Sequence, residues 1–428
     1  MTANSNKIIC YILLVSITIF PSLFFYSYGS MSHGLLLFSV LSIFLTYNLS
    51  KKKLSKELIE LFIKISLFSI LFVIIHYCIS FIFFINSNEI RFLYSIVSAF
   101  MIFLSSALFG IYLIQLESLN LLKIIFKIFY FFLIFLSILT FIRFSPLSPV
   151  YLTTNIYITI FSEPSHFATT MLPFITFYSL SINGKLKKIA NIIFFIILAL
   201  SIKNLTLLIG MALIFIATFE FKQVMKLLFF TFLILIIFSL INFIINNPGN
   251  NLFQSDYFRY FVERINLKTN LDNSLKVNMS VLVFFAGHHE MLLNLLYSNF
   301  FGVGFQQFGI VGVQSHIRDL IFINSGYFEF THNKDASFLI GKLISEFGFF
   351  GLIFLAFYIK IFIKNFLLIK NFFLKERNIL HLFASSCIIS FSIELFIRGS
   401  GYFTVSSYLF LVSLLIQKIY ILYDKKKS

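Results

Sequence analysis

An acid and an imidazole, Glu163 and His166, stand three residues apart at the start of an apolar run. Ser162 and Pro164 beside them suit the first turn of a helix, so capping is the structural alternative. Capping explains neither the carboxylate nor the imidazole, and the dipole at a helix N-terminus stabilises an ionised carboxylate. We therefore predict a catalytic role for Glu163 and contact with substrate for His166.

A second polar group, Thr331-His332-Asn333, directly precedes another apolar run. An imidazole changes charge near neutral pH and can accept a proton from a hydroxyl. We predict that His332 is a general base or orienting group and that Asn333 binds substrate.

Two acid–base pairs have helical i,i+4 spacing. Lys342 and Glu346 lie in the first turns after Asn333 and can neutralise each other. Glu394 and Arg398 repeat the spacing with the acid first, and we interpret them as a structural pair.

Arginine is concentrated in the segments that we predict to lie outside the cytoplasm. Six of the seven arginines fall there: Arg91, Arg143, Arg259, Arg264, Arg318 and Arg398. A guanidinium binds phosphate through two parallel hydrogen bonds, whereas an ammonium is a point charge. Arg259 and Arg264, with Arg318 as a third candidate, are predicted to hold a diphosphate, and Arg143 and Lys203 to add to substrate binding. The structural alternative is pairing with nearby acids or lipid headgroups.

No metal or other cofactor is predicted. The sequence has no His-Glu-x-x-His motif, and the adjacent residues His288 and His289 point to different faces of a helix. The three cysteines, Cys10, Cys78 and Cys387, lie in apolar runs without Cys-x-x-Cys spacing and are interpreted as packing residues.

Membrane helices must position these side chains. The 428 residues are 59% hydrophobic and only 12% charged, with a mean hydropathy of +0.95, which excludes an ordinary soluble protein. Apolar runs of roughly 20 residues, the length that crosses about 30 Å of hydrocarbon, recur along the chain. They predict an all-α bundle of about twelve spans in a single membrane domain, residues 1–428. The predicted spans are residues 8–25, 33–49, 58–85, 91–114, 121–142, 166–182, 189–203, 204–219, 227–246, 338–363, 378–397 and 404–422.

Lysine clusters predict the orientation, because basic loops stay in the cytoplasm during insertion. Clusters near residues 7, 51–56, 123–127, 185–188, 222–226, 360–377 and 425–427 all fall on one side if both termini are cytoplasmic. The outer side then carries a small loop, residues 143–166, and a large loop, residues 247–337. Residues 280–298 in the large loop are apolar but contain Gly287-His288-His289-Glu290, so we predict an amphipathic helix at the outer surface.

Four local patterns combine with this topology: Ser162-Glu163-Pro164-Ser165, Gly302-Val303-Gly304, Thr331-His332-Asn333 and Glu346-x-Gly-x-x-Gly. Together they resemble the O-antigen polymerase and ligase superfamily of bacterial polysaccharide assembly, over most of the chain. The resemblance implies a multi-pass protein of the bacterial inner membrane that transfers sugar repeat units from undecaprenyl diphosphate at the periplasmic face, without a metal.

The implied partners are an undecaprenyl-diphosphate-linked oligosaccharide and the lipid bilayer, with a chain-length regulator and a flippase as further candidates and no nucleic acid. A ligase of the same superfamily shares this architecture and stays an alternative. A flippase or transporter is the alternative from another class. It predicts polar residues spread through the span midplanes and short loops, rather than polar groups gathered in one long loop.

Overall fold

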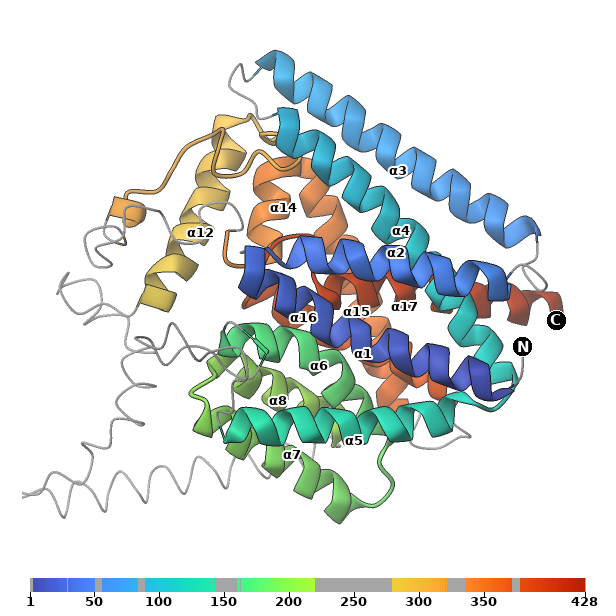
Figure 1. The fold of residues 1–428 in the computed structure, drawn as a ribbon. Coiled ribbons are helices and arrows are strands. Elements are labelled where there is room, and N and C mark those ends of the chain that lie inside the picture. Colours follow the sequence, from blue (N-terminus) through green and yellow to red (C-terminus); the bar gives the residue numbers. More distant parts are fainter. Residues whose placement is uncertain are drawn as a thin grey trace, which may run out of the picture.

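The computed structural model describes residues 3–28, 30–50, 56–83, 89–142, 160–161, 163–219, 279–319, 321, 336–371 and 378–427. These residues form helices and loops without a named strand, which confirms the all-α class. The helices (Figure 1) are α1 (Ala3–Tyr28), α2 (Met31–Ser50), α3 (Lys56–Phe83), α4 (Glu89–Ser118), α5 (Leu122–Phe141), α6 (Pro164–Ser181), α7 (Lys185–Ser201), α8 (Leu205–Thr218), α12 (Met279–Tyr297), α14 (Leu339–Phe347), α15 (Phe349–Asn371), α16 (Ile379–Phe396) and α17 (Val405–Lys427).

Six of the described helices are long and apolar enough to cross a membrane. These candidate spans lie in α1, α3, α4, α5, α15 and α16, and three shorter apolar segments lie in α2, α8 and α17. Their length and number indicate a multi-pass membrane protein. The predicted span at residues 227–246 and most of the predicted large loop lie outside the described residues.

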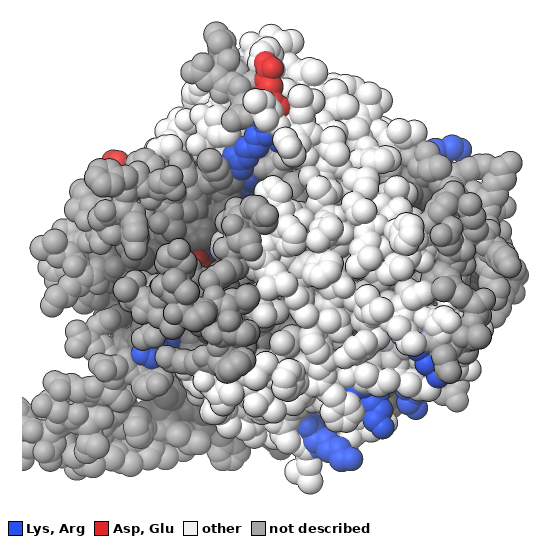
Figure 2. Space-filling model, in the orientation of Figure 1, with Lys and Arg blue, Asp and Glu red and all other residues white. Residues whose placement is uncertain are grey.

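Apolar side chains cover the outside of the bundle as well as its core. On α5, Phe129 and Leu133 are buried, whereas Phe131 and Phe135 on the opposite side are 63% and 56% exposed. A helix that is apolar all round belongs in lipid. Figure 2 shows a face that is largely uncharged at its centre, with basic side chains toward its rim. The two ends of the chain lie at the same end of the bundle (Figure 1).

Helix α6 lies in the centre of the bundle and positions the predicted Glu163. Its side chains are buried from His166 to Leu180, and it packs between α16, α17 and α8. A hydroxyl inside α6 can bond to the backbone of the preceding turn, as the Thr176 hydroxyl does when it donates to the carbonyl of Leu172 at 2.7 Å. Such a bond satisfies a buried polar group within the helix.

The predicted span at residues 338–363 is wrong as a single helix. Gly348 has a φ of +55° and divides the segment into α14 and α15. The amide of Phe349 donates to the carbonyl of Phe300 at 2.7 Å instead of continuing the α14 ladder. The candidate span therefore begins at Phe349. The helix predicted at residues 280–298 is present as α12, and its depth relative to the membrane stays a prediction.

Candidate functional site

The carboxylate of Glu163 forms an ion pair with Arg398. Arg398 Nη2 lies 3.1 Å from Glu163 Oε2, and the Ser165 hydroxyl donates to the same oxygen at 2.8 Å. The side chains of Arg398 and Glu163 are 19% and 31% exposed. Glu163 occupies the N-cap position of α6, with Pro164 following at the first helical position. This pair is therefore a partly exposed charged centre between the N-cap of α6 and the residues that follow α16.

The turn between α7 and α8 is joined to the start of α6. The Asn204 side chain donates to the carbonyl of Pro164 and accepts from the amide of Leu207 at 3.0 Å, so it caps α8 while holding the two helix beginnings together. Lys203, one residue earlier, has a φ of +53° and is half-buried. The structure thus brings the turn that carries Lys203 to the corner that carries Glu163.

His166 points into the bundle rather than toward this corner. It is buried and its ring meets Phe25 of α1 edge-on, with centroids 4.4 Å apart. The predicted contact of His166 with substrate stays a prediction, and the geometry favours support of the α6 N-terminus.

The predicted pairing of Glu394 with Arg398 is wrong. Helix α16 ends at Phe396, so Arg398 leaves helical register and turns to Glu163 instead. Glu394 is buried, with the side chains of Thr404 and Ser406 beside its carboxyl group in place of Arg398. Sequence reasoning therefore missed Arg398 as a site residue, although its place among the outer arginines was a usable signal.

Glu346 organises a second, fully buried polar centre. Its Oε2 accepts from the amide of Gln306 at 2.8 Å and its Oε1 from the amide of Phe308 at 3.1 Å. The Tyr402 hydroxyl donates to Oε2 at 2.7 Å. A carboxylate needs such donors when no water can reach it, so Glu346 serves to fix the loop before residue 309.

Lys342 neutralises this carboxylate, as predicted, within a wider network. Its Nζ lies 3.8 Å from Glu346 Oε1, bonds to Gln306 Oε1 at 3.0 Å and sits 5.0 Å from the centre of the Tyr402 ring. Burial raises the pKa of the Tyr402 hydroxyl well above its usual range, and the charge of Glu346 raises it further. Tyr402 therefore remains a proton donor at physiological pH.

The Gly302-Val303-Gly304 turn and the Glu346-x-Gly-x-x-Gly pattern form one structural unit. The amides of Val303 and Gly304 each donate at 3.0 Å, to the carbonyls of Ser345 and Glu346. Gly302 has a φ of +97°, and a Cβ there would lie 2.4 Å from the Glu346 carbonyl oxygen. Two motifs separated by some 40 residues thus require glycine because their backbones touch.

Gly348→Ala should destabilise the protein by roughly 3 kcal/mol or more, because the new Cβ combines a positive φ with severe overlap. That atom would lie 2.0 Å from the carbonyl oxygen of Phe300. Gly184→Ala is the matched control, with a φ of +93° and no atom within 4 Å, and should cost only the backbone strain of about 1–2 kcal/mol. A thiol-reactive dye that reports exposure of the buried Cys10 and Cys387 during heating measures both. Equal melting temperatures would contradict the close approach.

The segment between α16 and α17 connects the two polar centres. Arg398 reaches Glu163, while Tyr402 reaches Glu346 four residues later. Between them the amide of Gly399 donates to the carbonyl of Ser337 at 2.8 Å. This bond holds the residues that precede α14 beside the segment that carries Arg398.

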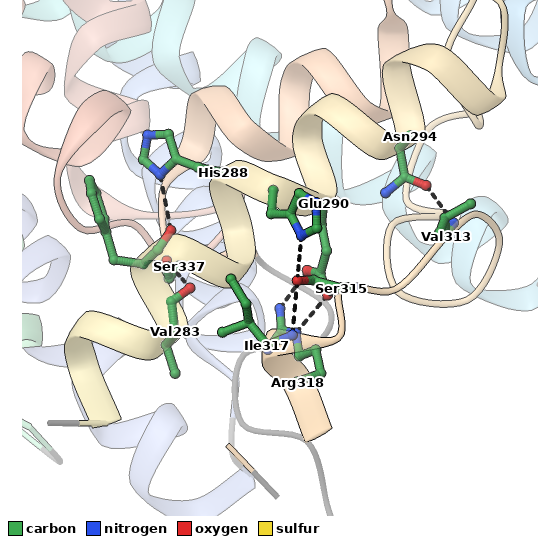
Figure 3. A network of polar contacts seen from close by, with 11 residues as sticks. Val283, His288, Glu290, Asn294, Val313, Ser315, Ile317, Arg318 and Ser337 are labelled. Atoms are coloured by element: carbon green, nitrogen blue, oxygen red, sulfur yellow. Dashed lines mark hydrogen bonds and ion pairs between the residues drawn. The ribbon is translucent and has the colours of Figure 1, made fainter. Parts of the chain in front are cut away.

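Arg318 forms a buried, two-pronged ion pair with Glu290 of α12 (Figure 3). Nε and Nη2 each lie 2.7 Å from a carboxylate oxygen, and both side chains are almost inaccessible. The amide of Ser315 donates to the same carboxylate at 3.3 Å, and the Ser315 hydroxyl contacts His289 at 2.8 Å. Arg318 therefore pairs with an acidic side chain, which is the structural alternative to phosphate binding, and this pair holds the loop against α12.

Glu290→Ala should cost about 3–5 kcal/mol, because it leaves the Arg318 guanidinium buried without its counter-charge. Replacing both partners, with Glu290→Leu and Arg318→Met, should restore stability to within about 1–2 kcal/mol of the parent. The same thiol-dye melting experiment distinguishes them. A double variant as unstable as the single one would show that the pair does more than hold the loop.

Five predicted site residues lie outside the described part of the chain: His332, Asn333, Arg143, Arg259 and Arg264. Of the four that are described, the structure gathers Glu163 and the turn bearing Lys203 at one corner, whereas His166 and Arg318 are buried elsewhere. Within the described ranges no three His, Cys, Asp or Glu side chains lie close enough to hold a metal ion. No protein-family model matches the chain, and neither a curated protein nor a solved structure is similar to it by direct comparison.

Proposed function

We propose that this protein is a polysaccharide polymerase of the O-antigen type, a glycosyltransferase that joins oligosaccharide repeat units carried on undecaprenyl diphosphate at the periplasmic face of the bacterial inner membrane. The observation that carries the proposal is the partly exposed Glu163–Arg398 pair at the end of an apolar helix bundle. A carboxylate beside a guanidinium supplies a proton acceptor and a phosphate ligand in one place.

The reaction forms a bond between an acceptor hydroxyl oxygen and the anomeric carbon of the donor sugar. The bond from that carbon to the lipid diphosphate breaks, and its electron pair leaves with the diphosphate. In our proposal the hydroxyl proton passes to His332 or Glu163, and Arg398, Arg259 and Arg264 stabilise the negative charge on the leaving group. When Arg398 binds the diphosphate, its ion pair with Glu163 breaks, which frees the Glu163 carboxylate as the acceptor sugar binds.

The direct genetic test follows polysaccharide length on gels in a strain that depends on this protein. Removing a general base lowers the rate by about 10²-fold or more, so His332→Ala should leave chains of a single repeat, and Arg264→Ala should shorten them. Normal ladders with both variants would remove this assignment. A ligase predicts a different phenotype on deletion, because no repeat at all reaches the final acceptor.

A further inference from the structure

Two imidazoles meet beside helix α12. His289 lies on α12 and His316 lies in the loop that follows this helix, and their ring centres are 5.2 Å apart with the ring planes at 80°. His289 is half-buried and His316 is exposed. The preceding residue, His288, points to another face of α12, where its ring stacks on Phe338 at 4.1 Å. The His288-His289 motif thus directs one ring into the protein and the other toward a second, accessible imidazole.

The hydrogen bonds of this pair leave ring nitrogens available. His289 Nδ1 lies 2.8 Å from the Ser315 hydroxyl, and within the described ranges no hydrogen bond occupies Nε2 of His289 or either nitrogen of His316. The Ser315 oxygen has two lone pairs, and the amide of Ile317 uses one of them at 3.1 Å. The other can accept the Nδ1 proton of His289, which leaves the Nε2 lone pair exposed to a ligand. Histidine ligands of metal ions are oriented by a hydrogen bond of this kind.

The spacing of the two rings fits one shared metal ion. A metal–nitrogen bond of about 2.0–2.1 Å puts the ion roughly 3.2 Å from each ring centre, so two histidine ligands at about 90–110° have centres roughly 4.5–5.2 Å apart. The observed 5.2 Å is the tetrahedral end of this range. An edge-to-face contact between two rings allows a similar distance, but it does not account for the hydroxyl that orients His289.

The two rings are carried on parts of the protein that are fixed to each other. Val313 and Arg318 stand before and after His316 in the loop, and both are bound to α12 (Figure 3). The amide of Val313 donates to Asn294 at 2.8 Å, and Arg318 forms its ion pair with Glu290. Ligands that are already ordered lose little entropy when an ion binds. Because Glu290 also balances the charge of Arg318, this guanidinium opposes a cation only weakly.

We propose that His289 and His316 bind one divalent transition-metal ion of the Cu²⁺ or Zn²⁺ type, with water in the remaining coordination positions. Imidazole nitrogen suits these ions, whereas Mg²⁺ and Ca²⁺ take oxygen ligands. The ion joins α12 to the loop that follows it, in addition to the Glu290–Arg318 pair. This inference does not depend on the proposed transferase activity.

The test titrates purified, untagged full-length protein with Cu²⁺ and records electron paramagnetic resonance spectra, after the exposed thiol of Cys78 has been alkylated. The parent should bind one Cu²⁺ tightly, with a hyperfine pattern from two nitrogen ligands, and excess Mg²⁺ should not displace it. His289→Ala and His316→Ala should each weaken binding by more than about tenfold and leave one nitrogen. Ser315→Ala should weaken it by about tenfold, because the orienting hydrogen bond is lost.

The matched control is His288→Ala, since its ring stacks on Phe338 instead of facing His316, and it should bind Cu²⁺ like the parent. His316 is exposed in a loop, so its variant tests the site even if His289→Ala fails to fold.

Three results would overturn the proposal. A parent that binds no Cu²⁺, or shows a single nitrogen ligand, would reduce the pair to an aromatic contact. Equal loss of binding in His288→Ala and His316→Ala would place the ion elsewhere. Binding of inorganic phosphate in place of Cu²⁺, abolished by His316→Ala, would assign the two rings to an anion.

Discussion

Arg398→Gln should lower the rate of repeat-unit transfer by about 10³-fold, because a preorganised donor that meets charge developing on a leaving group contributes this much. Arg398 is partly exposed and lies 3.1 Å from Glu163, so its loss should affect turnover more than folding. Glu163→Gln should also reduce the rate, by about 10²-fold. Transfer is measured with purified protein and a lipid-linked repeat unit.

The matched control for Arg398 is Glu394→Gln. Glu394 lies one helical turn earlier and is buried beside the side chains of Thr404 and Ser406, whereas Arg398 pairs with Glu163. Its replacement by the neutral amide of similar shape keeps the Glu163–Arg398 ion pair and should therefore leave the transfer rate within about twofold of the parent. If both variants lose activity equally, the ion pair has no special role.

Glu346→Gln should release the loop that contains Gln306 and Phe308 and lower stability by roughly 3–5 kcal/mol. The substitution keeps the shape of the side chain but leaves the Lys342 ammonium without its counter-charge. It also directs an NH₂ group at donors that now bond to the carboxylate, the amide of Gln306 and the hydroxyl of Tyr402. Thiol-dye melting, with Cys10 and Cys387 as the buried reporters, measures the loss.

Tyr402→Phe separates the charge of Glu346 from its hydrogen bonds. It removes one donor and retains Lys342, so it should cost only about 1–2 kcal/mol. A Glu346→Gln variant as stable as Tyr402→Phe would contradict a buried carboxylate at the centre of the network.

The sequence predicts most described helices well, since long apolar runs encode them locally. Helix α5 (Leu122–Phe141) was expected at residues 121–142, and α8 (Leu205–Thr218) at residues 204–219. The break at Gly348 was not predicted, because the acceptor that ends α14 is Phe300, which lies far away along the chain. Hydrophobic patterns do not report such contacts.

The candidate site was predicted less completely than the helices. Glu163 was identified from its place at a helix beginning, but its partner Arg398 is 235 positions away. The spacing from Glu394 to Arg398 suggested a helical pair only on the assumption that α16 continues through Arg398, whereas it ends at Phe396. Residue types and spacing thus located the charged groups but could not assign their partners.

The most direct test of the proposed function uses purified protein in lipid nanodiscs with repeat units linked to undecaprenyl diphosphate. Our account predicts lipid-linked products of two and more repeats with release of undecaprenyl diphosphate, and their loss in Arg398→Gln but not in Glu394→Gln. Folded parent protein that leaves the single repeats unjoined, or full product from Arg398→Gln, would contradict it.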